Sequence, residues 1–226
     1  MEVSRDVSVR EVFEAKNLAR VFEYLQKKGS CLEIDRDLIL FLHCMLLTAI
    51  NDDIAGRFRT HGEFVRVGTH IASAPDQIES LIQETLSVFR KANTHILEKI
   101  TTFHLDFETI HPFCDGNGRI GRVLINVQLM QAGYPPIIIR DKEKADYYKS
   151  FNVYQESQNI KSMSRVIYLA ILESLHKRIT YMKGQKIVRL TEYARKNNLS
   201  KHSLINKAGR QTIPAFREKG VWKIGS

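Results

Sequence analysis

The chain has 226 residues, of which 43% are hydrophobic, and a formal net charge of +9. This length predicts one full domain with an ample core and a small second module. No apolar run approaches the ~20 residues of a membrane span, and the amino terminus does not resemble a signal peptide. The three cysteines show no metal-binding spacing, which favours a reducing compartment. We therefore expect a cytoplasmic protein without a membrane segment.

The positive charge is concentrated at the carboxyl end of the chain. Residues 181–226 contain eleven lysines and arginines and two acidic residues, whereas residues 1–180 contain 23 of each kind. Such a division predicts two units with different partners. We place the boundary there, with a first domain over 1–180 and a basic domain over 181–226.

The first elements are expected to be helices. Apolar residues between Val9 and Leu25 recur at the spacing of an amphipathic helix. Asp35 is a suitable amino-terminal cap for the next helix, and residues 38–47 are nearly all apolar, which predicts a central position. His43 lies within that run, and we interpret it as a hydrogen-bonded core histidine rather than a ligand.

Residues 56–73 change character, because apolar and polar residues alternate around Gly62. The pattern predicts a short β-hairpin with its turn at Gly62. The edge of such a hairpin offers unpaired backbone groups to an extended peptide. The alternative is a hairpin that merely connects two helices.

Further helices are expected over 76–92 and 94–109, and Asp141 is a candidate cap for a helix that carries several tyrosines. A last long helix is expected over 162–180. The basic tail then predicts two short helices and a hairpin: residues 190–196, residues 200–208 with Ser200 as cap, and residues 213–224 with Gly220 at the turn.

Residues 111–122 read HPFCDGNGRIGR and lie between two segments of helical spacing. A glycine-rich loop that runs into a helix start exposes N–H groups at the positive end of the helix dipole, and such a site binds anions. Gly116 and Gly118 permit close approach of the backbone. Arg119 and Arg122 share a helix face and suit phosphate oxygens.

The same stretch contains a metal ligand and a base. Asp115 is a hard oxygen ligand of the kind that magnesium takes together with phosphates and water. His111 can act as a base near neutral pH. The alternative is a structural loop whose glycines end helices and whose charges form surface pairs, but such a loop does not require this combination of groups.

The stretch resembles the signature HPFx(D/E)GNGRxxR of the Fic family at every specified position. We judge that the resemblance covers residues 8 to about 178. It implies an all-α fold, a Fic-type helical bundle with a short β-hairpin called the flap, here residues 56–73. The tail resembles winged helix-turn-helix modules, so a small basic domain of that kind is expected after the bundle; the alternative is a basic surface that is only solvated.

The resemblance also implies an activity, the transfer of AMP from ATP to a Tyr, Thr or Ser hydroxyl of a target protein held on the flap. Relatives with other chemistries depart from the motif at Gly116 or Gly118, and this sequence does not. Carried over by position, the expected roles are a general base at His111, a Mg²⁺ ligand at Asp115, and phosphate binding by Gly116, Asn117, Gly118, Arg119 and Arg122.

One feature of many relatives is missing. No glutamate of this chain is followed by Gly or Asn, so the inhibitory motif (S/T)xxxE(G/N) is absent. Two explanations stay open: a separate antitoxin that supplies the glutamate, or a longer protein whose inhibitory helix precedes this sequence. The alternative function is a DNA-binding regulator in which the Fic core only binds nucleotide.

Overall fold

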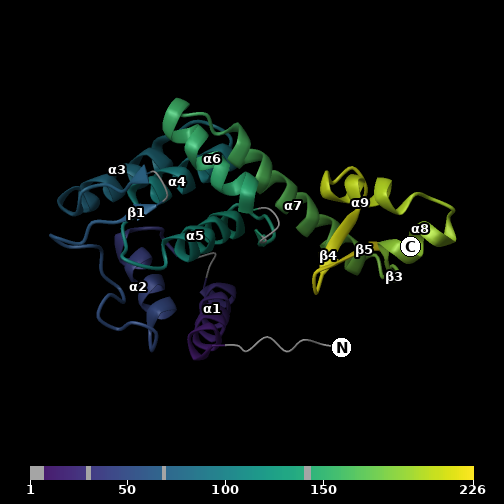
Figure 1. Ribbon diagram of the computed structural model, residues 1–226, viewed down its shortest axis with the longest axis horizontal. Helices are drawn as coiled ribbons and strands as arrows, with labels where there is room; N and C mark the ends of the chain where they lie inside the picture. Colours follow the sequence, from purple (N-terminus) through teal and green to yellow (C-terminus); the bar gives the residue numbers. More distant parts are fainter. Residues whose placement is uncertain (1–7, 29–31, 68–69, 140–143) are drawn as a thin grey trace. The chain divides into compact units, whose positions relative to one another are not determined.

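The computed structural model describes residues 8–28, 32–67, 70–139 and 144–226 (Figure 1). The chain divides into two compact units, and each is described by itself. The first comprises Met1–Gly133 with Phe151–Ile160, and the second comprises Tyr134–Ser150 with Lys161–Ser226.

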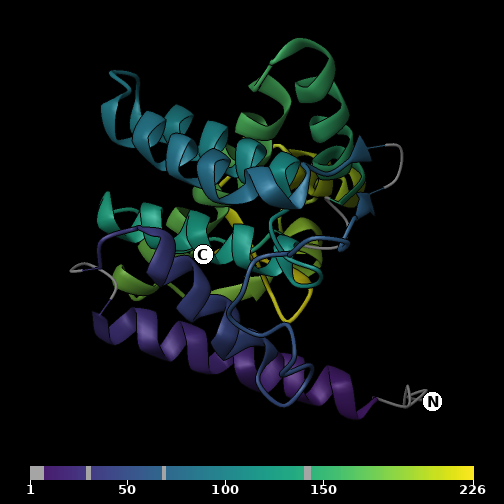
Figure 2. The ribbon, with the colours of Figure 1, turned by 90° about the vertical axis from the view of Figure 1, so that its left-hand side faces the viewer.

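The first unit is a helical bundle around α5. Figure 2 shows α3 and α4 on one side of α5, and α1 and α2 on the other. Apolar residues of α2, α4 and α5 form the centre of the core, and Leu42, Leu46, Phe107, Ile120 and Leu124 are fully buried. The helices of this bundle are α1 Val9–Lys28, α2 Arg36–Leu47, α3 Ile78–Lys91, α4 Ile96–Ile110 and α5 Asn117–Gln131.

Two local signals of the sequence are confirmed in this bundle. Asp35 caps α2, and its side chain accepts a hydrogen bond from the backbone N–H of Leu38 at 2.8 Å. The apolar face of α5 is buried as its spacing predicts. None of the helices in the described part of the chain is long and apolar enough to cross a membrane.

The expected hairpin is present, but it is shorter and lies later in the chain than the sequence suggested. Strand β1, Arg66–Val67, pairs antiparallel with β2, His70–Ile71. The prediction of a hairpin turn at Gly62 is therefore wrong. Gly62 belongs to a separate turn, in which the backbone N–H of Glu63 donates to the carbonyl of Thr60 at 3.0 Å.

The reason lies in two arginines of the alternating stretch. Arg57 donates two hydrogen bonds of 2.8 Å to the carboxylate of Glu63, and Arg59 is 2% exposed and bound to backbone carbonyls. Both side chains are held by these hydrogen bonds instead of alternating between two faces. The alternation of residues 57–67 therefore does not correspond to the two faces of a β-ribbon.

The second unit combines a long helix with a small sheet. Strands β3, β5 and β4 lie side by side in that order and are antiparallel, with Val188 and Ala215 both opposite Ile224. The two short helices pack on this sheet through a separate apolar cluster. The remaining helix α6, Lys144–Ser157, is divided between the two units at Phe151. The elements after it belong to the second unit: α7 Lys161–Met182, β3 Ile187–Arg189, α8 Leu190–Lys196, α9 Lys201–Gly209, β4 Ala215–Glu218 and β5 Val221–Gly225.

The tail elements agree with the sequence prediction, with one addition. Ser200 caps α9 and accepts a hydrogen bond from the N–H of Ser203, and the hairpin β4–β5 turns at Gly220, whose φ is 76°. Strand β3 was not predicted, because three residues are too few for a periodic signal. The candidate cap Asp141 lies outside the described residues.

Candidate active site

The loop of the motif is shaped by two residues with positive φ. Helix α4 ends at Ile110, and His111 follows in the left-handed region with φ 52°. Gly116, with φ 85°, is the amino-terminal cap of α5. A Cβ at Gly116 would lie 3.0 Å from Leu47 and 3.4 Å from the ring of His43. Both the conformation and the space therefore require glycine here.

His111 is held as a neutral imidazole. Its Nδ1 lies 3.3 Å from the backbone carbonyl of Glu108. A carbonyl only accepts, so Nδ1 carries the hydrogen and Nε2 carries the lone pair. Burial lowers the pKa of His111 to about 4, and the nearby cation Arg59 also lowers it. At neutral pH the ring is therefore uncharged and able to take up a proton.

Asp115 belongs to a ring of four charges formed with α1. Its carboxylate accepts from Arg119 at 3.0 Å and from Arg10, and both arginines also pair with Glu14. Burial alone would raise the pKa of Asp115, but Arg119, Arg10 and the N–H of Gly116 together lower it. The carboxylate is therefore ionised at neutral pH, and its side chain is 37% exposed.

The side chain of Asn117 is used inside the loop. Its Oδ1 accepts from the N–H of Phe113 at 2.9 Å, and its Nδ2 donates to the carbonyl of Phe113 at 2.7 Å. The amide therefore braces the loop, and the expected contact of Asn117 with a phosphate stays a prediction. Asn117 and Gly118 open α5, where N–H groups have no acceptor within the helix.

The second arginine of the motif lies close to the helix start. A Cβ at Gly118 would lie 3.2 Å from Nη1 of Arg122. The predicted residues Asp115, Gly116, Gly118, Arg119 and Arg122 thus lie at or beside the start of α5, His111 follows the end of α4, and the Asn117 amide is turned inward.

The sequence did not reveal the role of His43 in holding the loop. Its ring is fully buried and stacked on Phe113, with 3.7 Å between centroids and 7° between planes. The N–H of Gly56 donates to Nδ1 at 3.0 Å, so Nε2 carries the hydrogen and donates to the carbonyl of Asp115, also at 3.0 Å. Burial lowers the pKa of His43 to about 4, which keeps this arrangement neutral. The prediction of a hydrogen-bonded core histidine is confirmed.

Arg59 is a second functional residue that the sequence did not reveal. Its guanidinium donates to the carbonyls of His111 at 2.8 Å, Glu63 at 2.9 Å and Ser73 at 2.8 Å. Its own N–H donates to the carbonyl of Pro112 at 2.9 Å. One side chain therefore joins both ends of the flap region to the start of the motif.

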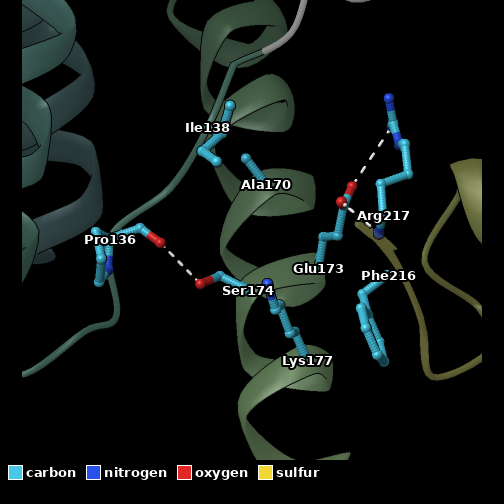
Figure 3. A pocket seen from close by; sticks show the side chains of 8 residues that line it. All are labelled: Pro136, Ile138, Ala170, Glu173, Ser174, Lys177, Phe216 and Arg217. Carbon is cyan, nitrogen blue, oxygen red and sulfur yellow. Dashed lines mark hydrogen bonds and ion pairs between the residues drawn. The ribbon is translucent and has the colours of Figure 1, made fainter. Parts of the chain in front are cut away.

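A pocket of the second unit contains none of the motif residues (Figure 3). There the buried carboxylate of Glu173 accepts from the N–H of Arg217 at 2.9 Å and pairs with its guanidinium at 3.4 Å. The hydroxyl of Ser174 donates to the carbonyl of Pro136 at 2.7 Å. These contacts join α7 to β4 and to the segment around Pro136. They have a structural role in the second unit and do not indicate a site.

Comparisons with known proteins show which family this chain is similar to. Residues 33–129 match the model of the Fic/DOC family. The chain is 33% identical over 152 residues to the protein adenylyltransferase Fic of Nematostella vectensis, covering 64% of this chain and 35% of that protein. It is 32% identical over 193 residues to the protein of the same name from Drosophila sechellia, covering 82% of this chain and 39% of the relative.

Among solved structures, a Fic domain containing signaling protein from Bacteroides thetaiotaomicron has the same fold. The TM-score is 0.70 at 22% identity, over 82% of this chain and 78% of that one. The chain spans little more than a third of the length of the two curated relatives above. The matched segment contains α2, the hairpin, α4, the complete motif and most of α5, so the similarity of this chain to the Fic/DOC family covers residues 33–129 and includes the candidate site.

Proposed function

We propose that this protein transfers AMP from ATP to a hydroxyl side chain of a target protein. The hydroxyl oxygen attacks the α-phosphorus, the bond from that phosphorus to the bridging oxygen breaks, and pyrophosphate leaves. The proton of the hydroxyl passes to Nε2 of His111. The proposal rests mainly on the tautomer of His111, which leaves a lone pair on Nε2. This residue begins the loop that leads to the positive end of α5.

The start of α5 supplies the groups that such a reaction needs. Phosphoryl-type transfer depends mainly on positioning and on stabilisation of charge. The N–H groups of Asn117 and Gly118 point out of the helix start and suit phosphate oxygens. Arg119 and Arg122 add guanidinium groups that bind phosphate in a fork geometry.

Mg²⁺ fits the residues present. Asp115 offers an ionised, partly exposed carboxylate, and the described residues contain no cluster of three or more acidic, histidine or cysteine side chains. One carboxylate with phosphates and water is the ligand set that magnesium commonly takes. When bound, the ion neutralises charge on the leaving pyrophosphate. Arg10 and Arg119 donate to this carboxylate, so a metal ion there would compete with these two arginines.

The flap supports docking of an extended protein segment. The strands β1 and β2 pair only with each other, so both are edge strands. The outer edge of such a strand can pair with an extended segment of another protein. Apolar side chains at and beside the strands are exposed, with 67% for Phe64, 42% for Val67 and 71% for Ile71. Such side chains fit pockets or apolar patches of a target.

The test uses ATP labelled at the α-phosphate, Mg²⁺ and candidate target proteins. We expect label on protein from the α-position and none from the γ-position; label from the γ-position would indicate a kinase. His111→Ala should abolish transfer, a loss of ~10²–10⁴-fold for a general base. ATP affinity should stay nearly unchanged, and Glu98→Gln, an exposed change on α4, serves as the control.

A second function, DNA binding by the carboxyl-terminal unit, is favoured by the arrangement of its charges. Helix, turn, helix and hairpin follow one another, and exposed cations line them: Arg195, Lys196, Lys201, Lys207, Arg210 and Lys219. Binding to a DNA duplex should fall steeply with salt, because counterion release dominates such contacts. Replacing Lys201, Lys207 and Arg210 with glutamine should weaken it without changing AMP transfer; equal binding by that variant would exclude this surface.

A further inference from the structure

Glu108 is a buried acidic residue beside the motif, and it has no role in the steps of AMP transfer described above. It lies in the last turn of α4, and its side chain is 9% exposed. Its Oε1 has no hydrogen-bond partner among the residues that the structure describes. A buried carboxyl group without a partner costs free energy, so its presence requires an explanation.

Glycines of α5 provide the space for this carboxyl group. A Cβ at Gly121 would overlap Oε1 of Glu108, and a Cβ at Gly118 would lie 3.9 Å from it. Gly121 lies within the motif stretch but at a position that phosphate binding does not require. The two helices therefore approach closely at the point where Glu108 needs room.

The carboxyl group faces the base from the side opposite to the reacting nitrogen. Oε2 of Glu108 lies 3.9 Å from Nδ1 of His111, and the backbone carbonyl of Glu108 accepts from the same nitrogen. One residue thus presents two oxygen atoms to Nδ1, a carbonyl in hydrogen-bond contact and a carboxylate just beyond it.

We propose that Glu108 is the positioning residue of His111 and stabilises the imidazolium that forms during transfer. This inference rests on the proposed AMP transfer. As the hydroxyl oxygen bonds to the α-phosphorus and pyrophosphate leaves, its proton moves to Nε2 and the ring becomes positive. The ionised carboxylate at Nδ1 offsets that charge, and the carbonyl keeps the tautomer that leaves Nε2 free.

The ionisation of Glu108 gives the proposal a signature. Burial raises the pKa of Glu108 to about 7, although the guanidinium of Arg122 lowers it. The pKa of His111 is about 4, so the base itself stays neutral through this range. The other charged or titratable groups that face this pair are His104 on α4, Arg122 on α5, and Arg59 and His70 on the segment before α3.

The first test is the pH profile of the wild type against Glu108→Gln, which keeps size and backbone but removes the charge. In the wild type kcat should fall as pH drops below about 7, because the carboxylate takes up a proton. In the variant kcat should be lower by roughly 10- to 1,000-fold at pH 8, the range for loss of a unit charge at this distance between bulk water and a protein site, and it should be flat between pH 6 and 8. KM for ATP should stay the same.

Matched controls and a second readout complete the test. Glu98→Gln should keep the wild-type profile, and a glutamine variant of Glu108 with the wild-type rate and profile would overturn the proposal. Without nucleotide, the ring resonances of His111, assigned by their loss in His111→Gln, should show an inflection near pH 7 that Glu108→Gln removes. An inflection that persists would also overturn it.

The two proposals can fail separately. A wild type that transfers no label would refute AMP transfer, while the resonance titration would still decide whether Glu108 acts on His111. Should the glutamine variant not fold, Glu108→Asp shortens the side chain and draws the carboxylate away from Nδ1, and the same loss of coupling is expected.

Discussion

Replacing Arg59 should loosen the flap and the motif together. Its side chain makes three hydrogen bonds of 2.8–2.9 Å to the carbonyls of His111, Glu63 and Ser73, and a longer one of 3.3 Å to Ile110. Charged hydrogen bonds contribute roughly 1.5–3 kcal/mol each, and the burial cost of the guanidinium offsets part of that sum. Arg59→Met keeps the volume and should lower the free energy of unfolding of the first unit by about 3–5 kcal/mol, as for other broken buried charge contacts.

Hydrogen exchange is the assay that locates this loss. The N–H at position 59 donates to Pro112, and the N–H of Ala72 donates to Val65. These two amides are expected to exchange through opening of the first unit. A loss of about 3 kcal/mol in its free energy of unfolding should then speed their exchange by roughly 100-fold. The control Arg20→Met changes an exposed arginine of α1. Exchange rates within about twofold of the wild type would refute the reasoning, since surface changes shift stability by only about 0.5 kcal/mol.

Trp222 provides an internal reference for the same experiment. It is the single tryptophan of the chain and lies in β5 of the second unit, where the guanidinium of Arg217 stacks over its ring at 4.3 Å. Its emission should report the melting of the second unit and stay unchanged in Arg59→Met. A changed Trp222 signal would mean that the substitution acts beyond the first unit.

Three further predictions concern the charges around the motif. Arg122→Ala should reduce AMP transfer by ~10²-fold through misplacement of the triphosphate, and a wild-type rate would remove Arg122 from the phosphate site. Arg10→Met should lower the Mg²⁺ concentration needed for ATP binding by up to about fivefold in calorimetry, the range of an exposed ion pair; no shift would show that Arg10 does not compete. Burial lowers the pKa values of His43 and His111 to about 4 and of His104 to about 3, so the unfolded chain binds more protons and stability should fall as pH drops from 6.5 towards 4, by up to about 4 kcal/mol per pH unit. Glu108, whose pKa is raised to about 7, opposes this slope by about a third as much. Urea unfolding at several pH values measures the slope, and a flat profile would contradict it.

The sequence by itself determined those features whose signals are local. The helices follow from apolar spacing, and Asp35 and Ser200 mark helix starts because a cap bonds to an N–H two or three residues away. The start of α5 was predictable for the same reason, since glycines and a helix start lie next to each other in the chain. The candidate site was therefore largely readable from one continuous stretch.

Tertiary structure decided the features that join distant segments. Gly56 meets His43 across the loop after α2, and Arg59 reaches His111 from 52 positions away. No periodic pattern in a single sequence encodes such contacts, because the partners belong to different elements. The sequence showed only the alternation around Gly62, which is typical of a β-ribbon. It did not show that Arg59 binds backbone carbonyls of other segments, and the ribbon prediction failed for that reason.

The roles of Asn117 and Glu108 were decided in the same way. An asparagine in a glycine-rich loop can bind a phosphate or brace the loop itself. The two hydrogen bonds between the Asn117 amide and the backbone of Phe113 show that here it braces the loop. Glu108 is one of several acids on an amphipathic helix in the sequence. It becomes a partner of the base only because α5 approaches α4 at Gly121 and excludes water from the carboxyl group.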